Sequence, residues 1–533
     1  MTASAAHIPY RETGYFTRIV LDYIAQSPAL KEFYSHPPDW NGMQAALEAK
    51  KKTPVNRAAL VQVLEEQYAA VETGDAVKQN IRQLLSENTF SICTAHQPNI
   101  FTGHLYAIYK IAHAIKLAEA CNKQFPGQHF VPVYYMGSED ADLEELGHIF
   151  LGGEKLVWDT RQTGAVGRMN IDKAALDMLH RIAGELEVQP FGKELMHIMR
   201  SAYAAGKTMQ QASLELFNTL FGKYGLVVLI ADHATLKKSM LPVFTDDLFR
   251  QIPSQLVKET SEKLSQQYKV QAHARDINLF YLTENKRERI EQKGEQFEVL
   301  NSDTRFSAGE LKKELEDHPE RFSPNVILRG IYQETILPNI AFIGGGGELA
   351  YWLEFKKMFA HYNVPFPVLV LRNSFLVVEE KWKKKMEALG LSIPEIFLKE
   401  QPLADAYVKR HAEHPVSIDE EIRAATAFYE ALKTTAGKTD ATLVPHIASL
   451  EKKAVHRLQE LEKKMLRAEK RKFSDSVAQI QKLKNALFPH NSLQERIDNF
   501  MPGYARYGSG FIDMVYEHSL PIEAKFTVLF PVD

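Results

Sequence analysis

A polar loop follows the apolar segment Thr89–Thr94, which has the composition of a buried strand. The loop covers residues 95–104 and leads into an amphipathic helix expected over Leu105–Lys123. In open α/β sheets, ligands bind at the carboxyl ends of strands, where the start of the next helix favours an anion. A helix cap at Thr102 and a tight turn at Gly103 would explain the loop without a ligand, but its position favours binding. The candidate residues of this loop and helix are His96, Gln97, Asn99, Thr102, Gly103, His104, Tyr109 and Lys110.

Five carboxylates stand within seven residues shortly after a second expected strand, Phe130–Met136. Such a cluster is repulsive unless it is solvated or faces a cation such as a substrate amine. The start of a helix would also favour these side chains. Because the cluster follows a buried strand in the second position of the sheet, we interpret its first members as acid–base groups. The candidate catalytic residues are Glu139, Asp140 and Asp142, together with His96, and the secondary candidates are Glu144, Glu145 and His148.

Four consecutive glycines separate the expected strand Ala341–Ile343 from a helical segment. Without side chains, their backbone N–H groups can approach a phosphate or carboxylate closely. The run matches neither the phosphate-binding loop of nucleotide hydrolases nor the dinucleotide fingerprint, and a flexible turn explains it almost as well. The candidate binding residues of this segment are Gly344, Gly345, Gly346, Gly347, Glu348 and Tyr351.

Two arginines near expected strand ends indicate recognition of an acid, because a guanidinium can bind a carboxylate through two hydrogen bonds. Arg329 follows an expected strand at residues 325–328, and Arg372 ends the expected strand Pro367–Leu371. A single arginine is usually a surface ion-pair partner, but two of them with glycines between make a carboxylate site the better interpretation. The neighbouring polar candidates are Gln333, Glu334 and Ser374.

The order of the expected elements predicts an α/β fold with a doubly wound parallel sheet. A strand, a helix and a second strand in succession imply a right-handed parallel crossover. Further strands are expected at 225–230, 325–328, 341–343 and 367–371, so the sheet collects segments from residues 1–376. Residues 150–220 and 240–320 are expected to be insertions, the second with a small antiparallel piece at Leu279–Ser302. Residues 11–88 are expected to be helices that cover the core.

Residues 377–488 form a separate helical region in this interpretation. Apolar residues recur every three or four positions among charged ones, which predicts a coiled coil. The turn of an antiparallel hairpin is expected at Thr435–Thr439. The tail, residues 489–533, is expected to return to the core and to end in an edge strand at 524–529. The apolar seam consists of Ile447, Leu450, Ala454, Leu458, Leu461, Met465 and Ala468.

The amino-acid composition argues against several classes of protein. The formal net charge of −3 gives no general attraction to nucleic acid or an anionic membrane. No run of about 18 apolar residues is present to span a bilayer. The two cysteines, Cys93 and Cys121, exclude a disulfide framework and a cysteine-only metal cluster, and they fit a reducing cytoplasm. We therefore expect a cytoplasmic protein with small-molecule partners, and we assign no metal ligands.

Several of these segments together resemble the BshC family, to which the last step of bacillithiol synthesis is assigned. They occur in the same order over nearly the whole chain, and they include Thr102-Gly103, Leu105-Tyr106, Tyr109-Lys110-Ile111, Val131-Pro132-Val133, Glu139 to Glu145, Gln333-Glu334-Thr335, Leu337-Pro338, Gly344-Gly345, Gly347 to Trp352, Leu493 to Arg496 and Asn499-Phe500. The sequence departs from the family pattern at His96, His104 and Gly346, where glutamine, proline and proline are frequent. These departures argue against catalytic duty for the two histidines.

The resemblance implies a Rossmann-like core with inserted connecting segments and a coiled-coil arm that mediates a homodimer. It also implies a ligase that joins cysteine to glucosaminyl-malate through an amide bond. In this hypothesis an acidic residue among Glu139, Asp140 and Asp142 orients or deprotonates the amine, and Arg329 or Arg372 holds malate carboxylates. The cofactor is not identified, with ATP or another nucleotide a candidate for activating the carboxylate. The alternative is a non-catalytic nucleotide- or metabolite-binding scaffold that acts through its coiled coil.

Overall fold

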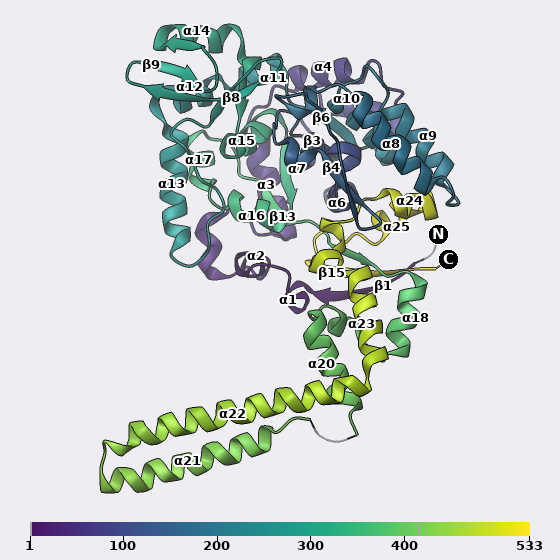
Figure 1. The fold of residues 1–533 in the computed structure, drawn as a ribbon. Coiled ribbons are helices and arrows are strands. Elements are labelled where there is room, and N and C mark those ends of the chain that lie inside the picture. Colours follow the sequence, from purple (N-terminus) through teal and green to yellow (C-terminus); the bar gives the residue numbers. More distant parts are fainter. Residues whose placement is uncertain (1–2, 414–415, 533) are drawn as a thin grey trace. The chain divides into compact units, whose positions relative to one another are not determined.

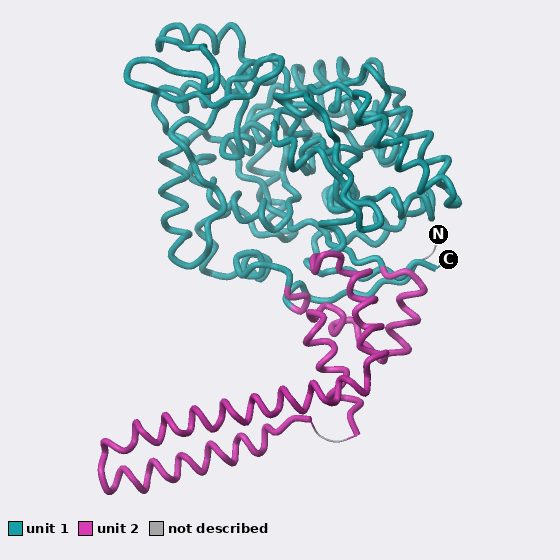
Figure 2. The backbone as a smooth tube through the Cα atoms, in the orientation of Figure 1, with its two compact units in different colours: residues 1–11, 15–377, 493–533 teal, residues 12–14, 378–492 magenta. Residues whose placement is uncertain are grey.

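The computed structural model describes residues 3–413 and 416–532. Its backbone forms two compact units, shown in different colours in Figure 2. The first unit contains residues 1–11, 15–377 and 493–533 as far as they are described, and the second contains residues 12–14 and 378–492. The tail beyond residue 492 therefore belongs to the unit that holds the sheet.

The centre of the first unit is a five-stranded parallel sheet (Figure 1). Its order is β13 (Val368–Leu371), β12 (Asn339–Gly344), β2 (Thr89–His96), β3 (His129–Met136) and β6 (Val227–Ile230). The strands are almost entirely buried because helices cover both faces of the sheet. The chain proceeds from β2 outward to β6 and then crosses to β12, so the order reverses between β2 and β12. The predicted α/β class with a doubly wound sheet is confirmed, and this reversal is where such folds bind ligands.

Helices from the first hundred residues cover the sheet, as predicted. α3 (Trp40–Lys51) contributes Met43 and Leu47 to a buried cluster with β2, β3, β12 and β13, and the later helix α6 (Tyr106–Gln124) adds Leu117 to it. α4 (Arg57–Tyr68) lies near β6, where the hydroxyl oxygen of Tyr68 accepts the N–H of Val228 at 2.8 Å. The amino-terminal helices therefore complete the core of the sheet.

The predicted strand at residues 325–328 is wrong. These residues belong to α15 (Val326–Ile336), and the short strand β11 (Phe322–Pro324) precedes it. The Asn325 side chain accepts the N–H of Ile327 at 2.8 Å and so begins the helix. Arg329 consequently stands on the first turns of a helix.

An inserted antiparallel sheet is present where residues 279–302 predicted one. Its order is β10 (Arg305–Ser307), β9 (Gln296–Val299), β8 (Arg287–Lys293), β7 (Leu279–Leu282) and β11. The earlier insertion contains α8 (Lys173–Leu186), α9 (Gly192–Ala202) and α10 (Met209–Phe221). β11 leads directly into α15, so this sheet is anchored next to the parallel core.

The carboxyl-terminal strand β15 (Lys525–Pro531) is central, so the predicted edge strand is wrong. It pairs antiparallel with β1 (Ala3–Pro9) and parallel with β14 (Phe375–Val377). β1 has little apolar alternation, so its pairing with β15 could not be predicted from the local pattern. The tail brings residues 493–499 back into the first unit.

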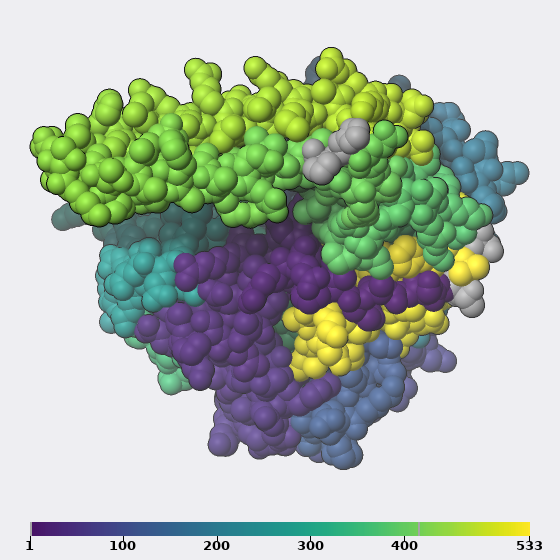
Figure 3. Space-filling model, turned by 90° about the horizontal axis from the view of Figure 1, so that it is seen from below, coloured from purple at the N-terminus to yellow at the C-terminus, as the bar shows by residue number. Residues whose placement is uncertain are grey.

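The second unit contains the predicted coiled coil. α21 (Asp419–Thr439) and α22 (Leu443–Lys472) lie side by side, and α23 (Ser474–Leu487) follows them (Figures 1 and 3). The turn predicted at 435–439 is wrong, because α21 continues to Thr439 and the chain turns at residues 440–442. Gly437 stays helical, and a Cβ there would stand 3.2 Å from Val444 Cγ2, so glycine permits close packing of the pair. No helix in the described ranges has the length and apolar character needed to cross a membrane.

Candidate functional site

A cavity of about 470 Å³ opens at the carboxyl edge of the parallel sheet, beside the reversal between β2 and β12. Residues after β2, β3, β12 and β13 line it, together with residues from the inserted sheet, α15 and the tail. The lining is Ala95, His96, Gln97, Tyr106, Lys110, Gly137, Asp140, Glu145, Phe280, Arg287, Asn325, Val326, Arg329, Gly345, Gly346, Gly347, Glu348, Tyr351, Arg372 and Arg496.

A larger cavity of about 560 Å³ lies between residues 251–277 and the inserted sheet, and it shares no lining residue with the first. We take the smaller cavity as the candidate site because it stands at the strand ends, where doubly wound folds bind ligands. It also gathers the loops that the sequence singled out.

The glycine loop is tied to α6 by an ion pair. Lys110 Nζ lies 2.5 Å from Glu348 Oε2 and donates to the carbonyl of Ala95 at 2.8 Å. The same carboxylate accepts the N–H of Gly345 at 2.7 Å. Since the Lys110 side chain is only 3% exposed, this pair holds the ends of β2 and β12 together.

A second buried ion pair joins the end of β13 to the tail. Arg372 Nη2 lies 2.6 Å from Glu495 Oε1, with the two side chains 4% and 0% exposed. Ser374 donates to the same oxygen at 3.2 Å, and the Arg372 guanidinium stands 5.4 Å from the Tyr106 ring centroid. Arg372 thus lines the cavity while the Glu495 carboxylate, which is not part of the lining, balances its charge.

Asp140 is the acidic group held among arginines. Its Oδ2 lies 3.4 Å from Arg329 Nη2 and accepts from Gln97 Nε2 at 3.2 Å, and Oδ1 lies 3.9 Å from Arg287 Nη1. Burial alone would raise the pKa of Asp140, but Arg329 and Arg287 outweigh it and hold that pKa below its usual value. Asp140 is therefore ionised and able to orient a cationic or hydrogen-bond-donating group.

Glu145 and His96 are the titratable groups suited to proton transfer. Burial, with Asp142 and Asp140 nearby, raises the pKa of Glu145. Burial, with Lys110 and His104 nearby, lowers the pKa of His96 well below its usual value, so the ring is neutral at pH 7. The environment therefore strengthens the Glu145 carboxylate as a base and weakens the His96 ring as one.

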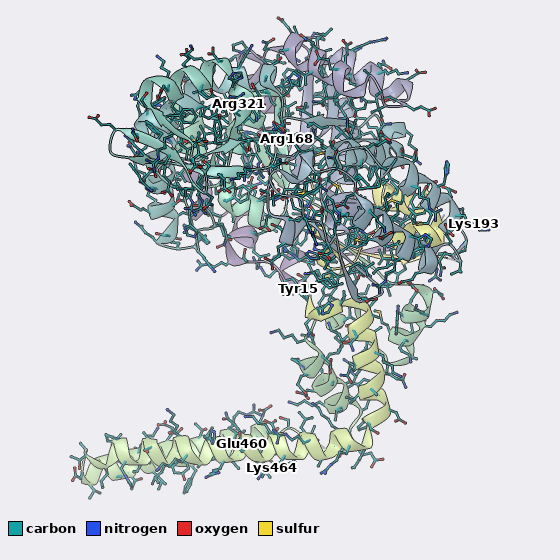
Figure 4. The ribbon with its side chains drawn as sticks, turned by 45° about the horizontal axis from the view of Figure 1, so that its top comes forward. Tyr15, Arg168, Lys193, Arg321, Glu460 and Lys464 are labelled. Atoms are coloured by element: carbon teal, nitrogen blue, oxygen red, sulfur yellow. The ribbon has the colours of Figure 1, made fainter. Side chains whose placement is uncertain are left out.

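Glu139 and Asp142 lie outside the cavity lining. Glu139 Oε1 is 2.5 Å from Lys237 Nζ, which is also 3.0 Å from Asp232 Oδ1. Arg168, labelled in Figure 4, binds Asp232 through two hydrogen bonds of 2.7 and 2.9 Å. Asp142 accepts the N–H of Glu145 at 3.0 Å and caps α7 (Leu143–Leu146). Both carboxylates are engaged in holding the loop after β3.

The second half of the loop after β2 turns away from the cavity. Phe101, Thr102 and Gly103 have positive φ angles of 50°, 70° and 66°. A Cβ on Gly103 would stand 2.7 Å from Asn99 Cβ, and Asn499 Nδ2 donates to the carbonyls of Phe101 and Gly103. Thr102 caps no helix, since α6 has no side-chain cap. This part of the loop is a tight turn held by the tail.

Several other candidates lie outside the cavity lining, and most of them are buried in the core. The His104 ring packs 5.9 Å from His148, and the Tyr109 ring 4.8 Å from Phe375. Gln333 and Asn339 both donate to Glu334 Oε1 at 2.8 Å. Gly344 ends β12, and Ser374 lies behind Arg372. The structure thus brings about half of the candidates together: His96, Gln97, Lys110, Asp140, Arg329, Gly345, Gly346, Gly347, Glu348, Tyr351 and Arg372.

Sequence reasoning missed Tyr106, Arg287 and Arg496. Arg496 stands in a segment that resembles the family, which is a signal that could have placed it at the site. Arg287 lies in the charged middle of the inserted hairpin, where no local pattern distinguishes it from a solvated side chain. Within the described ranges, no group of three or more His, Cys, Asp or Glu side chains is arranged to hold a metal ion.

The fold and the cavity define an α/β core with a polar ligand site at its switch point and an appended coiled coil. The family description "Bacillithiol biosynthesis BshC, N-terminal Rossmann-like domain" matches residues 3–373, and the BshC "C-terminal coiled-coil domain" matches residues 375–531. This chain therefore belongs to the BshC family of bacillithiol biosynthesis.

Relatives match along the whole chain. The protein of Flavobacterium psychrophilum is 39% identical over 525 residues, which cover 98% of each chain. That of Flavobacterium johnsoniae is 38% identical over 524 residues, 98% of this chain and 99% of its own. That of Cytophaga hutchinsonii is 38% identical over 494 residues, 92% of each. Each carries the name "Putative cysteine ligase BshC".

Proposed function

We propose that this chain is a cysteine ligase that joins the carboxyl group of L-cysteine to the amine of glucosaminyl-malate, forming the amide bond of bacillithiol. The family membership and the names of the relatives support the ligase class. The observation that carries the proposal is a single cavity where carboxylates suited to an amine stand beside arginines suited to carboxylates.

The acidic side of the cavity supplies what an attacking amine needs. Asp140 is ionised and orients the amine, while Glu145, with its raised pKa, takes the proton that the amine loses. The nitrogen lone pair attacks the cysteine carboxyl carbon, the C–N bond forms and the C–O bond to the departing oxygen breaks. Holding the amine and the carboxyl carbon in contact supplies much of the acceleration.

A free carboxylate is a poor electrophile, so cysteine requires activation, and ATP or another nucleotide is the candidate donor. Gly345, Gly346 and Gly347 line the cavity, and a Cβ on Gly347 would meet nothing within 4 Å. This open glycine surface fits an anionic group, with Lys110 and Arg372 beside it. A nucleotide held there would supply the phosphoryl or adenylyl group that activates the cysteine carboxylate, and this group would leave with the carboxylate oxygen when the amide forms.

We further propose that the ligase is a cytoplasmic homodimer joined through the coiled coil. Large apolar side chains are exposed along the α21–α22 pair, including Phe428 at 60%, Leu450 at 41% and Leu461 at 48%. A second copy would cover them. Cys93 and Cys121 are both free thiols, as in a reducing compartment.

The test compares Asp140→Asn with Asp159→Asn in the full chain supplied with L-cysteine, glucosaminyl-malate and ATP, with the thiol product measured by mass spectrometry. Asp159→Asn is the matched control, because Asp159 is exposed and lies outside the cavity. We expect Asp140→Asn to lower turnover about a hundredfold and the control to stay near wild type. Equal activity of the two variants would remove Asp140 from the mechanism.

A cellular measurement separates the ligase from a scaffold that binds a metabolite without converting it. Cells that lack the gene accumulate glucosaminyl-malate if the chain is the ligase. An unchanged level of glucosaminyl-malate would favour the scaffold.

A further inference from the structure

The positive charges around the cavity are not balanced equally. Five basic side chains line it: Lys110, Arg287, Arg329, Arg372 and Arg496. Lys110 is paired with Glu348 at 2.5 Å, and Arg372 with Glu495 at 2.6 Å. Those two cations are neutralised within the protein and mainly hold the walls together.

Arg496 is a cation of the cavity without such a partner. It enters from the short 3-10 helix Gln494–Arg496, and within residues 3–413 and 416–532 no carboxylate lies in ion-pair distance of it. Burial and the neighbouring Arg372 lower its pKa, as expected for a cation that lacks compensation. Its side chain remains exposed toward the cavity, so a ligand can reach it.

Arg287 is the second under-compensated cation, and it is held rigidly. Its Nε donates to Ser323 Oγ at 2.9 Å, its Nη2 donates to the carbonyl of Pro324 at 3.2 Å, and its guanidinium stands 4.0 Å from the Phe280 ring centroid. Asp140 is its ion-pair partner at 3.9 Å, but that carboxylate is closer to Arg329. Two arginines thus share one carboxylate, and the side chain of Arg287 is only 7% exposed.

We propose that Arg287 and Arg496 are the receptors for the two carboxylates of the malate group of the acceptor, so that the site selects an acceptor that carries a dicarboxylate. The proposal rests on the proposed ligase function and deepens it. The inserted sheet supplies one receptor and the carboxyl-terminal tail supplies the other, so both appended segments contribute to specificity. A guanidinium binds a carboxylate through two parallel hydrogen bonds, which makes arginine the suitable residue at both places.

Phosphate of a nucleotide is the other anion that these arginines could receive. The binding experiment therefore uses malate, glucosaminyl-malate and ATP as separate probes.

The experiment measures binding of each probe by calorimetry to the full wild-type chain, Arg496→Gln, Arg287→Lys and the control Arg82→Gln. Arg82 is an exposed arginine that does not line the cavity. We expect Arg496→Gln and Arg287→Lys to weaken malate and glucosaminyl-malate binding roughly ten- to hundredfold, the effect of losing a charged hydrogen bond, while ATP binding is retained. The control should bind all three probes as the wild type does. In turnover, KM for glucosaminyl-malate should rise more than kcat falls.

Loss of ATP binding with malate binding intact would overturn the proposal in favour of phosphate. Wild-type affinity of Arg496→Gln for malate, or no binding of malate and glucosaminyl-malate by the wild type, would also overturn it. Circular dichroism verifies folding, and the exposed Arg496 keeps the test decisive if the buried Arg287 variant does not fold. A wild type that binds malate through these arginines without forming an amide would defeat the ligase proposal and leave this inference standing.

Discussion

The buried ion-pair network around Lys237 allows a quantitative test of whether Glu139 stabilises the fold or takes part in catalysis. Lys237 is completely buried, and it contacts Glu139 at 2.5 Å, Asp232 at 3.0 Å and the carbonyl of Glu320 at 3.1 Å. Replacing Lys237 with methionine leaves Glu139 buried without a cation, while Arg168 still binds Asp232. Breaking a buried ion pair in this way costs about 3–5 kcal/mol. Glu139→Gln should cost less, because it removes a charge whose burial already raises the pKa of Glu139.

The assay is urea unfolding followed by tryptophan fluorescence in a Trp382→Phe background. Trp40, Trp158 and Trp352 then report on the first unit alone. We expect Lys237→Met to lower the unfolding free energy more than Glu139→Gln, and the double variant to lose less than the two effects added. We also expect folded Glu139→Gln to keep kcat within about tenfold of wild type, since Glu139 lies outside the cavity. A folded but inactive Glu139→Gln would refute this reasoning and return Glu139 to the catalytic machinery.

Three further predictions follow from single side chains. Because the pKa of Glu145 is raised and its ionised form is the base, kcat/KM should fall as pH drops through that raised pKa, and Glu145→Gln should abolish this acid limb in a pH–rate profile. Gly347→Ala should stabilise α16 (Gly346–Trp352) by about 0.5–1 kcal/mol and raise KM for the nucleotide. The control Gly184→Ala, in α8 and equally unobstructed, should change the free energy of unfolding alone. An unchanged KM of Gly347→Ala would argue against the glycine loop as a binding surface. Leu461→Asp should convert the proposed dimer to a monomer, as measured by light scattering. The control Lys464→Gln changes a residue on the same helix (Figure 4) and should leave the dimer intact. A Leu461→Asp variant that stays dimeric would disprove pairing through this seam.

The sheet was predictable because its strands are buried on both faces. β2 and β3 read as continuous apolar runs, and the helix between them fixes their parallel order. Residues 325–328 were predicted to be a strand because the three apolar residues Val326–Leu328 fit a buried strand or a buried helix equally, and the cap at Asn325 decides for the helix. β15 was wrongly predicted to be an edge strand because its neighbour β1 lies more than 500 residues away in the chain and carries little apolar alternation.

The site was predictable where a residue stands at or shortly after the carboxyl end of a strand of the parallel sheet. His96 ends β2, Asp140 lies four residues after β3, and Gly345 and Arg372 directly follow β12 and β13; all four line the cavity. Asn99 and Thr102 follow the same strand, but the backbone turns them into the core, which depends on the tail residue Asn499. Arg287 and Arg496 reach the cavity only after the inserted sheet and the tail have packed, so no local pattern could reveal Arg287, and only the family-like segment Leu493 to Arg496 pointed to Arg496.

A crystal structure of the chain soaked with glucosaminyl-malate tests the central claim most directly. We predict that the ligand occupies the 470 Å³ cavity with its amine toward Asp140 and Glu145 and its carboxylates at Arg287 and Arg496. Glucosaminyl-malate bound elsewhere on the molecule, with this cavity empty, would contradict the account.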